Sequence, residues 1–405
     1  MSALVRTSAS IPRVRLRQAS HLKHVSAGIR SADVHNPLFH MEIYKNPRYR
    51  LTGYATSDEE TAAGGTAMTV VSAPGKVYLF GEHAVVYGEP AVPCAIERRA
   101  TVTAEPRDDS HVRVEAQDLT LDGFAVEYDG EPDERSNVDV PKPLLDAATG
   151  YVDAAVEQAR EAADAPAAGF DISVSSDIPL GAGLGSSAAV VVAGIEAATQ
   201  ALGEPLDRDE LADRAYQAEY DVQDGQASRA DTFCSTMGGA VRVEGDDCNA
   251  ITAPPLPFVV GFDGGAGDTG ELVAGVRSLR DRYGFAADTV EAIGDIVREG
   301  ESLLAEADPD TDPSAELIGK LGELMDINHG LLSALGVSSR SLDTMVWAAR
   351  EAGADGAKLT GAGGGGCIVA LDATDETATS LDYTPDCEQA FRAELATEGV
   401  RLEDE

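Results

Sequence analysis

The 405-residue chain lacks the features that mark membrane proteins, disulfide-bonded secreted proteins and nucleic-acid-binding proteins. No apolar run reaches the roughly 18 residues that a membrane span needs. The five cysteines are widely spaced and form no CxxC pair, which excludes a disulfide framework or a zinc site and favours a reducing cytosol. Only 31 Lys and Arg stand against 70 Asp and Glu, so the net charge of −39 repels nucleic acid and anionic lipid. We therefore expect a cytoplasmic protein that binds neither membranes nor nucleic acid.

The excess of acidic residues is spread along the chain and does not form a tail. A self-repelling, hydrated surface of this kind is typical of a protein that works at high ionic strength, where salt screens the repulsion within a few ångström. We interpret it as halophilic, adapted to a salt-rich cytoplasm. Ordinary acidic solubility is the alternative.

The first 57 residues differ from the rest in charge. They hold nine basic and two acidic residues, a formal charge of +7 that leaves −46 for the remainder. They also lack helical or strand periodicity. We interpret residues 1–67 as a non-native or disordered leader, translated from a start placed upstream of the true one at Met68. A transit peptide is the alternative.

From Thr69 onward the hydrophobic pattern is regular and predicts strands first. Short buried strands are expected at Val70–Val71 and Val77–Phe80, and a half-buried strand at Phe170–Val174. Helices are expected from Ser186 to Ala201 and after a capping box that begins at Asp207.

The composition changes after the Pro-rich stretch at 254–257. Long amphipathic helices are predicted there, and a final apolar strand follows a Gly-rich run. The helices cover residues 290–304, 315–332 and 342–352, and the strand covers 367–371. Strands and helices alternate without a βαβ repeat, so we predict an α+β protein with domains at 68–250 and 251–405.

A glycine-rich segment at 179–188 joins a strand to the helix that begins at Ser186. Glycines let successive backbone N–H groups form an anion-binding nest, and the helix N-terminus adds partial positive charge. The segment is no Walker loop, because no Lys follows the glycines. It predicts a phosphate site, with Mg²⁺ ligation by its hydroxyls; a tight turn is the alternative.

A second glycine-rich segment, at 356–367, contains G-x-G-x-x-G. A dinucleotide site requires a helix after this motif, and the residues that follow, Ile368–Leu371, are strand-like. We therefore reject a dinucleotide site and expect a loop near phosphates or substrate. A plain turn between strands is the alternative.

A third segment, at 73–88, places Lys76, Glu82 and His83 in otherwise apolar surroundings. Burying such groups without partners is costly, so they indicate a functional site.

These three segments resemble sequence motifs of a known protein family. Ala73–Gly88 resembles the N-terminal signature of the mevalonate kinases, a family of the GHMP superfamily, and the segments at 179–189 and 358–367 resemble the superfamily's phosphate loop and C-terminal motif. The likeness extends to 269–277, 325–329 and 335–338, and covers about 70–371. Galactokinases share Gly-Glu-His but differ around it.

The resemblance implies a two-domain GHMP kinase fold, with an N-terminal lobe like ribosomal protein S5 domain 2 and a ferredoxin-like C-terminal lobe. It implies a kinase that uses ATP and Mg²⁺ to phosphorylate (R)-mevalonate for isoprenoid synthesis. Members of the family are often dimers, so a homodimer is one expectation, although no interface is evident in the sequence.

By position, the resemblance also assigns roles to residues. Asp231 corresponds to the general base and Lys76 to the cation beside it. Glu82, His83, Thr269 and Gly363 correspond to substrate contacts, and Ser187 and Glu219 to Mg²⁺ ligands. The nucleotide would be held by Pro179, Leu180, Gly181, Ala182, Gly183, Leu184, Gly185, Ser186 and Ser187.

These roles also make physical sense, because phosphoryl transfer depends on positioning and on cancelling charge. One spacing departs from the family pattern: Glu219 and Asp231 are 12 residues apart, one more than expected. Asp221 and Asp224 are therefore alternatives for the metal. We prefer Glu219 because Ala215, one turn earlier, lies on the apolar face.

Three other functions stay open. The chain could be another GHMP kinase of the same pathway, a decarboxylating relative, or a non-catalytic nucleotide-binding member. A phosphorylated substrate would need extra Arg or Lys near the motifs, and none clusters there. Loss of the base or the metal ligands would mark the non-catalytic case, yet all are present.

Overall fold

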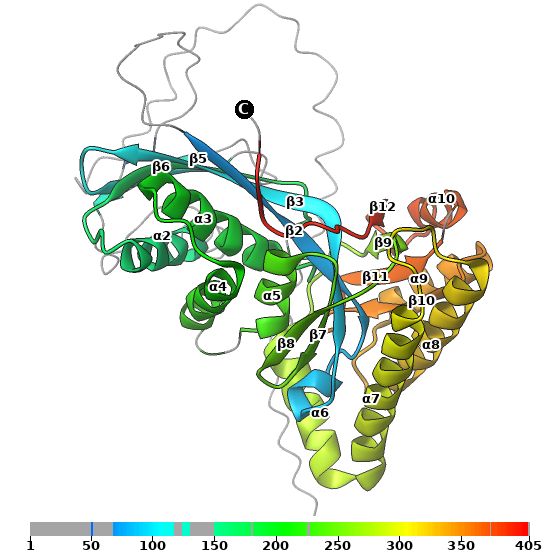
Figure 1. Ribbon diagram of the computed structural model, residues 1–405. Helices are drawn as coiled ribbons and strands as arrows, with labels where there is room; N and C mark the ends of the chain where they lie inside the picture. The colour runs from blue at the N-terminus through cyan, green and yellow to red at the C-terminus, as the bar shows by residue number, and fades with distance from the viewer. Residues whose placement is uncertain are drawn as a thin grey trace, which may run out of the picture. The chain divides into compact units, whose positions relative to one another are not determined.

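The computed structural model describes residues 50–51, 68–116, 124–129, 150–179, 181–223, 225, 227–372 and 374–403. Apart from Arg50–Leu51, the predicted leader at 1–67 lies outside them, as do Leu180 and Asp224. The described chain forms two β-sheets with helices packed on them (Figure 1), which agrees with the predicted α+β class.

The first sheet has nine strands and includes most of the early chain. Its main path runs β1-β5-β4-β6-β3-β2-β13, while β7 pairs with β3 and β8 with β7. All pairs are antiparallel except β4 with β6. The strands are β1 (Arg50–Leu51), β2 (Thr69–Phe80), β3 (Val92–Arg107), β4 (His111–Ala116), β5 (Phe124–Asp129), β6 (Gly169–Ser176), β7 (Ala240–Glu244), β8 (Asp247–Ile251) and β13 (Arg401–Leu402).

Strand β2 carries the first signature and differs from the prediction. Two short strands were expected, whereas Thr69–Phe80 forms one strand whose register against β3 shifts between Pro74 and Gly75. Such an irregularity lets the strand continue through a Pro-Gly pair that would otherwise end it. The 3₁₀ helix η1 (Ala84–Tyr87) follows directly.

Helices α2 to α5 lie together beneath this sheet (Figure 1). They are α2 (Tyr151–Ala162), α3 (Ser186–Leu202), α4 (Arg208–Val222) and α5 (Arg229–Met237). The predicted helix from Ser186 is confirmed as α3, whose many buried Ala and Val side chains pack on β2 and β3. The predicted cap is confirmed too, because the Asp207 side chain accepts a hydrogen bond from the Glu210 N–H at 2.8 Å.

The second sheet has four antiparallel strands in the order β10-β11-β9-β12. They are β9 (Pro257–Phe262), β10 (Gly356–Thr360), β11 (Cys367–Leu371) and β12 (Gln389–Glu394). The accompanying helices are α6 (Thr269–Arg282), α7 (Gly284–Ala305), α8 (Ala315–Ala334), α9 (Arg340–Glu351) and α10 (Glu376–Asp382). The three helices predicted in this region are confirmed as α7, α8 and α9.

The end of the chain differs from the prediction of a final strand at 367–371. Two more strands follow, and the last one, β13, returns to pair with β2 of the first sheet. Arg99 anchors this returning segment by donating to the carbonyls of Glu398 and Gly399. The division into domains near residue 250 stays a prediction: β9 to β12 all follow it, but β13 belongs to the first sheet.

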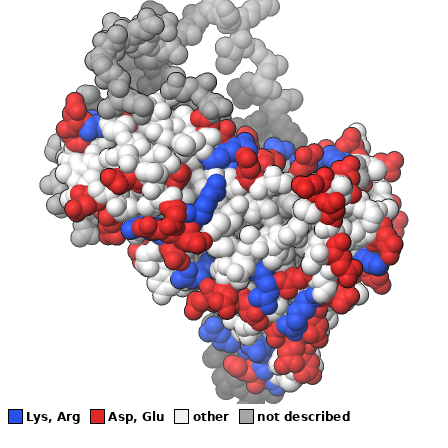
Figure 2. All heavy atoms as spheres, in the orientation of Figure 1, with Lys and Arg blue, Asp and Glu red and all other residues white. Residues whose placement is uncertain are grey.

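The five cysteines are free thiols, and Cys94, Cys234 and Cys367 are buried. Figure 2 shows acidic side chains scattered over the visible face, with fewer basic ones among them. Within the described ranges, no helix is both long and apolar enough to cross a bilayer.

Candidate active site

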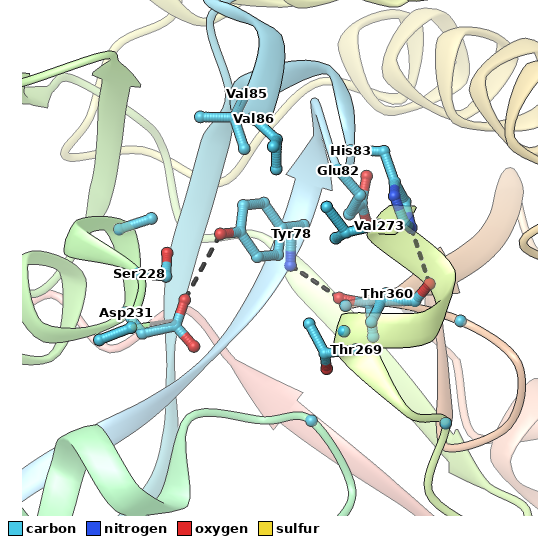
Figure 3. A pocket seen from close by; sticks show the side chains of 18 of the residues that line it. Tyr78, Glu82, His83, Val85, Val86, Ser228, Asp231, Thr269, Val273 and Thr360 are labelled. Atoms are coloured by element: carbon cyan, nitrogen blue, oxygen red, sulfur yellow. Dashed lines mark hydrogen bonds between the residues drawn. The ribbon is translucent and has the colours of Figure 1, made fainter. Parts of the chain in front are cut away.

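A cavity of about 930 Å³ opens where β2, α5, α6 and the two glycine-rich segments meet. Side chains from β2 and α5 line one part, and residues of α6 and of the loop between β10 and β11 line another (Figure 3). The three segments singled out in the sequence thus meet at one hollow, although they lie up to about 290 residues apart.

Lys76 and Asp231 face each other at this cavity. Lys76 lies on β2 and Asp231 in the first turn of α5, and Lys76 Nζ is 3.1 Å from Asp231 Oδ2. The Lys76 side chain is 4% exposed and the Asp231 side chain 23%. Lys76 Nζ also donates to the carbonyl of Gly183 at 3.2 Å, so one cation links the carboxylate to the glycine loop.

The first glycine loop is bound to β2 and leads into α3. The Lys76 N–H donates to the Leu184 carbonyl at 2.8 Å. Gly185 precedes α3 with φ of 74°, a left-handed conformation that favours glycine. A Cβ there would lie 3.0 Å from Lys76 Cγ, so this residue must also be small.

The predicted nucleotide residues occupy different environments. Gly181, Ala182 and Gly183 line the cavity, whereas the Leu184 side chain is buried in the core. Pro179 comes before the loop and is partly exposed, and Ser186 opens α3. Leu180 is outside the described residues.

Ser187 and Glu219, the predicted metal ligands, contact each other. Ser187 Oγ donates to Glu219 Oε1 at 2.6 Å. Glu219 is 2% exposed, as its spacing from Ala215 predicted. Burial, and then the charge of Asp231, raise the pKa of Glu219 to about 7. Neither side chain is among the described residues that line the cavity.

Asp221 and Asp224 were the alternative metal ligands. Asp221 is exposed and accepts a hydrogen bond from Gln217 at 2.7 Å, so it points away from Ser187. Asp224 is outside the described residues.

Glu82 and His83 are buried at the turn after β2, at 2% and 5% exposure. Glu82 forms an ion pair with Lys358 of β10, which is fully buried. Its second oxygen, Oε2, has no hydrogen-bond partner among the described residues. Because Glu82 lines the cavity, a hydroxyl group that enters the cavity could satisfy this oxygen.

His83 has an unusual backbone with φ of 61°, a strain that in proteins is concentrated at functional sites. Its Nε2 lies 2.7 Å from the carbonyl of Ala362 (Figure 3), so Nε2 carries the proton. Burial lowers the pKa of His83, which keeps the ring neutral and leaves Nδ1 as an acceptor. Nδ1 is buried and has no partner in the described part of the chain.

The other two predicted substrate residues also line the cavity. Thr269 is the first residue of α6, after the Asp268 cap. Gly363 has φ of 84°, and a Cβ there would lie 2.1 Å from the Val337 carbonyl oxygen. Only glycine allows this approach between the loop and the segment after α8.

Sequence reasoning did not assign Tyr78, Lys358 or Thr360 to the site. Lys358 and Thr360 lie on β10, whose five residues are all buried, and a Lys inside such a strand is the signal that could have identified it. Tyr78 had no such signal, because an aromatic residue in a buried strand is ordinary.

Family profiles agree with this geometry. The GHMP kinases N terminal domain matches residues 150–239 and the GHMP kinases C terminal domain matches 314–381. The galactokinase galactose-binding signature matches 60–106, the region that includes Gly81-Glu82-His83.

Individual relatives identify the family more closely. A mevalonate kinase of Pyrococcus horikoshii is 41% identical over 339 residues, which is 83% of this chain and 98% of that protein. The crystal structure of the Methanococcus jannaschii mevalonate kinase has a TM-score of 0.67 and 26% identity, covering 84% of this chain and 99% of the other.

A third match is the L. major mevalonate kinase in complex with R-mevalonate. Its TM-score is 0.67 at 23% identity, with 82% of this chain and 96% of that one covered, so it supports the fold alone. The identity to the Pyrococcus protein over nearly its whole length decides the classification: this chain belongs to the mevalonate kinase family of the GHMP kinases.

Proposed function

We propose that this chain transfers the γ-phosphoryl group of ATP to the primary alcohol of (R)-mevalonate and forms 5-phosphomevalonate. The observation that carries the proposal is the pairing of Lys76 Nζ with Asp231 Oδ2 at 3.1 Å, beside the glycine loop. A carboxylate, a cation and a phosphate-binding loop at one cavity are the groups that phosphoryl transfer to an alcohol requires.

Asp231 acts as the base in this proposal. The hydroxyl oxygen attacks the γ-phosphorus, the hydroxyl proton passes to the Asp231 carboxylate, and the bond between the γ-phosphorus and the bridging oxygen breaks to release ADP. Lys76, held between Asp231 and Gly183, neutralises charge on the transferring group. The backbone N–H groups at 181–186 and the start of α3 hold the phosphates.

Ser187 and Glu219 would hold Mg²⁺ on the nucleotide. They provide two hard oxygen donors 2.6 Å apart. The described residues contain no cluster of three or more His, Cys, Asp or Glu that could hold a metal alone. A hydroxyl and one carboxylate suit an ion that takes its other ligands from phosphates and water. When bound, Mg²⁺ supplies further neutralisation of phosphate charge.

Glu82, His83, Thr269 and Gly363 would contact the substrate. The free Glu82 Oε2 and His83 Nδ1 are both acceptors, and they suit the hydroxyl groups of a small polyol acid. Mevalonate is preferred because the similar proteins named above are mevalonate kinases, one of them in complex with R-mevalonate.

Other expectations from the sequence belong to the same proposal. The acidic composition supports an enzyme of a salt-rich cytoplasm. Two domains divided near residue 250 are also proposed, and residues on both sides of this position line the cavity. A homodimer is proposed from family likeness alone.

The test is a coupled assay of ADP release by the full chain in molar KCl, with mevalonate, phosphomevalonate, homoserine and galactose offered separately. Galactose is included because the galactose-binding signature matches this chain. We expect the highest kcat/KM with mevalonate. A higher value with any other compound, or no ADP release with all four, would overturn the proposal.

A further inference from the structure

Tyr78 lies between the groups proposed to carry the chemistry and has no role so far. It follows Lys76 by two residues on β2, so the two side chains project from the same face of the strand. Its side chain is 6% exposed and lines the cavity. Figure 3 shows its ring in the middle of the site, with the phenol directed at Asp231.

Tyr78 contacts both members of the Lys76–Asp231 pair. The phenol oxygen is 3.4 Å from Asp231 Oδ1, while Lys76 Nζ pairs with the other oxygen, Oδ2. Lys76 Nζ also lies 4.5 Å from the centroid of the tyrosine ring, within the range of a cation–π contact. One side chain thus restrains the carboxylate through its hydroxyl and the ammonium through its ring.

We propose that Tyr78 is a positioning residue for phosphoryl transfer, one that fixes the orientation of the Asp231 carboxylate relative to Lys76. The proposal rests on the function proposed above. A carboxylate held by one oxygen only can rotate, whereas contacts to both oxygens from different sides fix its plane. Small errors in the placement of a base lower reaction rates strongly, so this restraint should raise the rate of phosphoryl transfer.

The phenol can act as the donor because it stays protonated. Burial raises the pKa of Tyr78 well above its usual value, and the negative charge of Asp231 raises it further. The Ser228 side chain, at the start of α5, opposes this rise in the pKa of Tyr78. The phenol hydroxyl therefore has a polar partner, the Asp231 carboxylate.

Strand β10 of the second sheet holds the backbone of Tyr78. The Tyr78 N–H donates to Thr360 Oγ1 at 2.8 Å, and Lys358 Nζ donates to the Tyr78 carbonyl at 3.3 Å. Both partners belong to the strand that leads into the second glycine-rich loop. The position of the ring is thereby fixed by both sheets.

The test compares Tyr78→Phe with Tyr87→Phe in the full chain. Tyr78→Phe removes the hydroxyl and keeps the ring over Lys76. Tyr87→Phe is the matched control, since it also removes one tyrosine hydrogen bond, to the Val273 carbonyl, without touching Asp231. We measure single-turnover phosphoryl transfer by rapid quench, dissociation constants of ATP and mevalonate, and thermal melting.

We expect Tyr78→Phe to lower the single-turnover rate about tenfold or more, with both dissociation constants within twofold of wild type. Tyr87→Phe should transfer at the wild-type rate. A transfer rate for Tyr78→Phe within twofold of wild type would overturn the inference. So would a fall in rate matched by weaker mevalonate binding, because Tyr78 would then be a substrate contact.

A second variant keeps the inference testable if Tyr78→Phe does not fold. Thr360→Val leaves the tyrosine in place and removes the hydroxyl that accepts a hydrogen bond from its backbone N–H at 2.8 Å, and we expect a smaller fall in rate without a change in binding. An unchanged rate there, with Tyr78→Phe unfolded, would overturn the inference. Failure of wild type to phosphorylate mevalonate would instead overturn the proposed function.

Discussion

The candidate site is distinguished by charged side chains that are buried. Lys76, Glu82, Glu219 and Lys358 are all buried, in a protein whose other charges mostly face water. Charged groups are buried only where partners compensate them. Glu82 and Lys358 pair with each other, Lys76 pairs with Asp231, and Glu219 accepts a hydrogen bond from Ser187. The proposed chemistry and the stability of the fold should therefore depend on the same few contacts.

The Lys358–Glu82 pair offers a direct test of this dependence. Lys358→Met should lower the free energy of unfolding by about 3–5 kcal/mol, because the buried Glu82 carboxylate loses its cation. Urea denaturation monitored by circular dichroism measures the change.

A control uses the exposed pair of Lys320 and Glu316, joined at 2.8 Å one helical turn apart. Lys320→Met should leave the urea midpoint almost unchanged, because solvent screens this pair. Adding Glu82→Gln to Lys358→Met should restore part of the lost stability. Equal losses for Lys358→Met and Lys320→Met would contradict the importance of burial.

Some of these residues could be predicted from the sequence and others could not. Lys76, Glu82 and His83 stood out as polar residues in an apolar segment, and burial of Glu219 followed from the spacing to Ala215. The contact of Tyr78 with Asp231 joins residues 153 positions apart. Only the packing of α5 against β2 creates it, and no local pattern reports that packing.

At the scale of elements, the glycine loop and α3 form the most constrained part of the site. Helix α3 was predicted from composition, because its segment is rich in Ala and Val, contains no Pro and follows a glycine-rich turn. Strands β12 and β13 were missed because each is short and partly exposed, which leaves little hydrophobic signal. The two parts of β2 were separated in the prediction because a Pro-Gly pair usually ends a strand.

Alanine variants of two glycines at opposite ends of α3 distinguish the effect of backbone strain from the effect of displacing Lys76. Gly185→Ala places a Cβ 3.0 Å from Lys76 Cγ, at φ of 74°. Gly203→Ala has a similar φ of 81°, but no atom lies within 4 Å of its added Cβ. Each should lose about 1 kcal/mol of unfolding free energy from the left-handed backbone.

Only Gly185→Ala should also lower kcat, about tenfold or more, because it moves the ammonium away from Asp231. Steady-state kinetics and urea titration of both variants measure the two effects. A loss of kcat in Gly203→Ala equal to that in Gly185→Ala would show that backbone strain, and not the position of Lys76, controls the rate.

At the scale of the whole described chain, the end of the polypeptide joins the two sheets. The Gly239 N–H donates to the Ala396 carbonyl, and the Val400 N–H donates to the Thr236 carbonyl at 3.2 Å. These bonds fix the end of α5, the helix that carries Asp231. Asp231 is thus positioned by β2 at one side and by the last described residues of the chain at the other.

The central claim is that Asp231 accepts the proton of the alcohol while Lys76 and the glycine loop hold the transferring phosphoryl group. The most direct measurement is the single-turnover rate of phosphoryl transfer to mevalonate by Asp231→Asn, combined with its ATP dissociation constant. We expect the rate to fall about 100-fold or more, with ATP binding within a few-fold of wild type. A wild-type rate of transfer with intact ATP binding would contradict the claim.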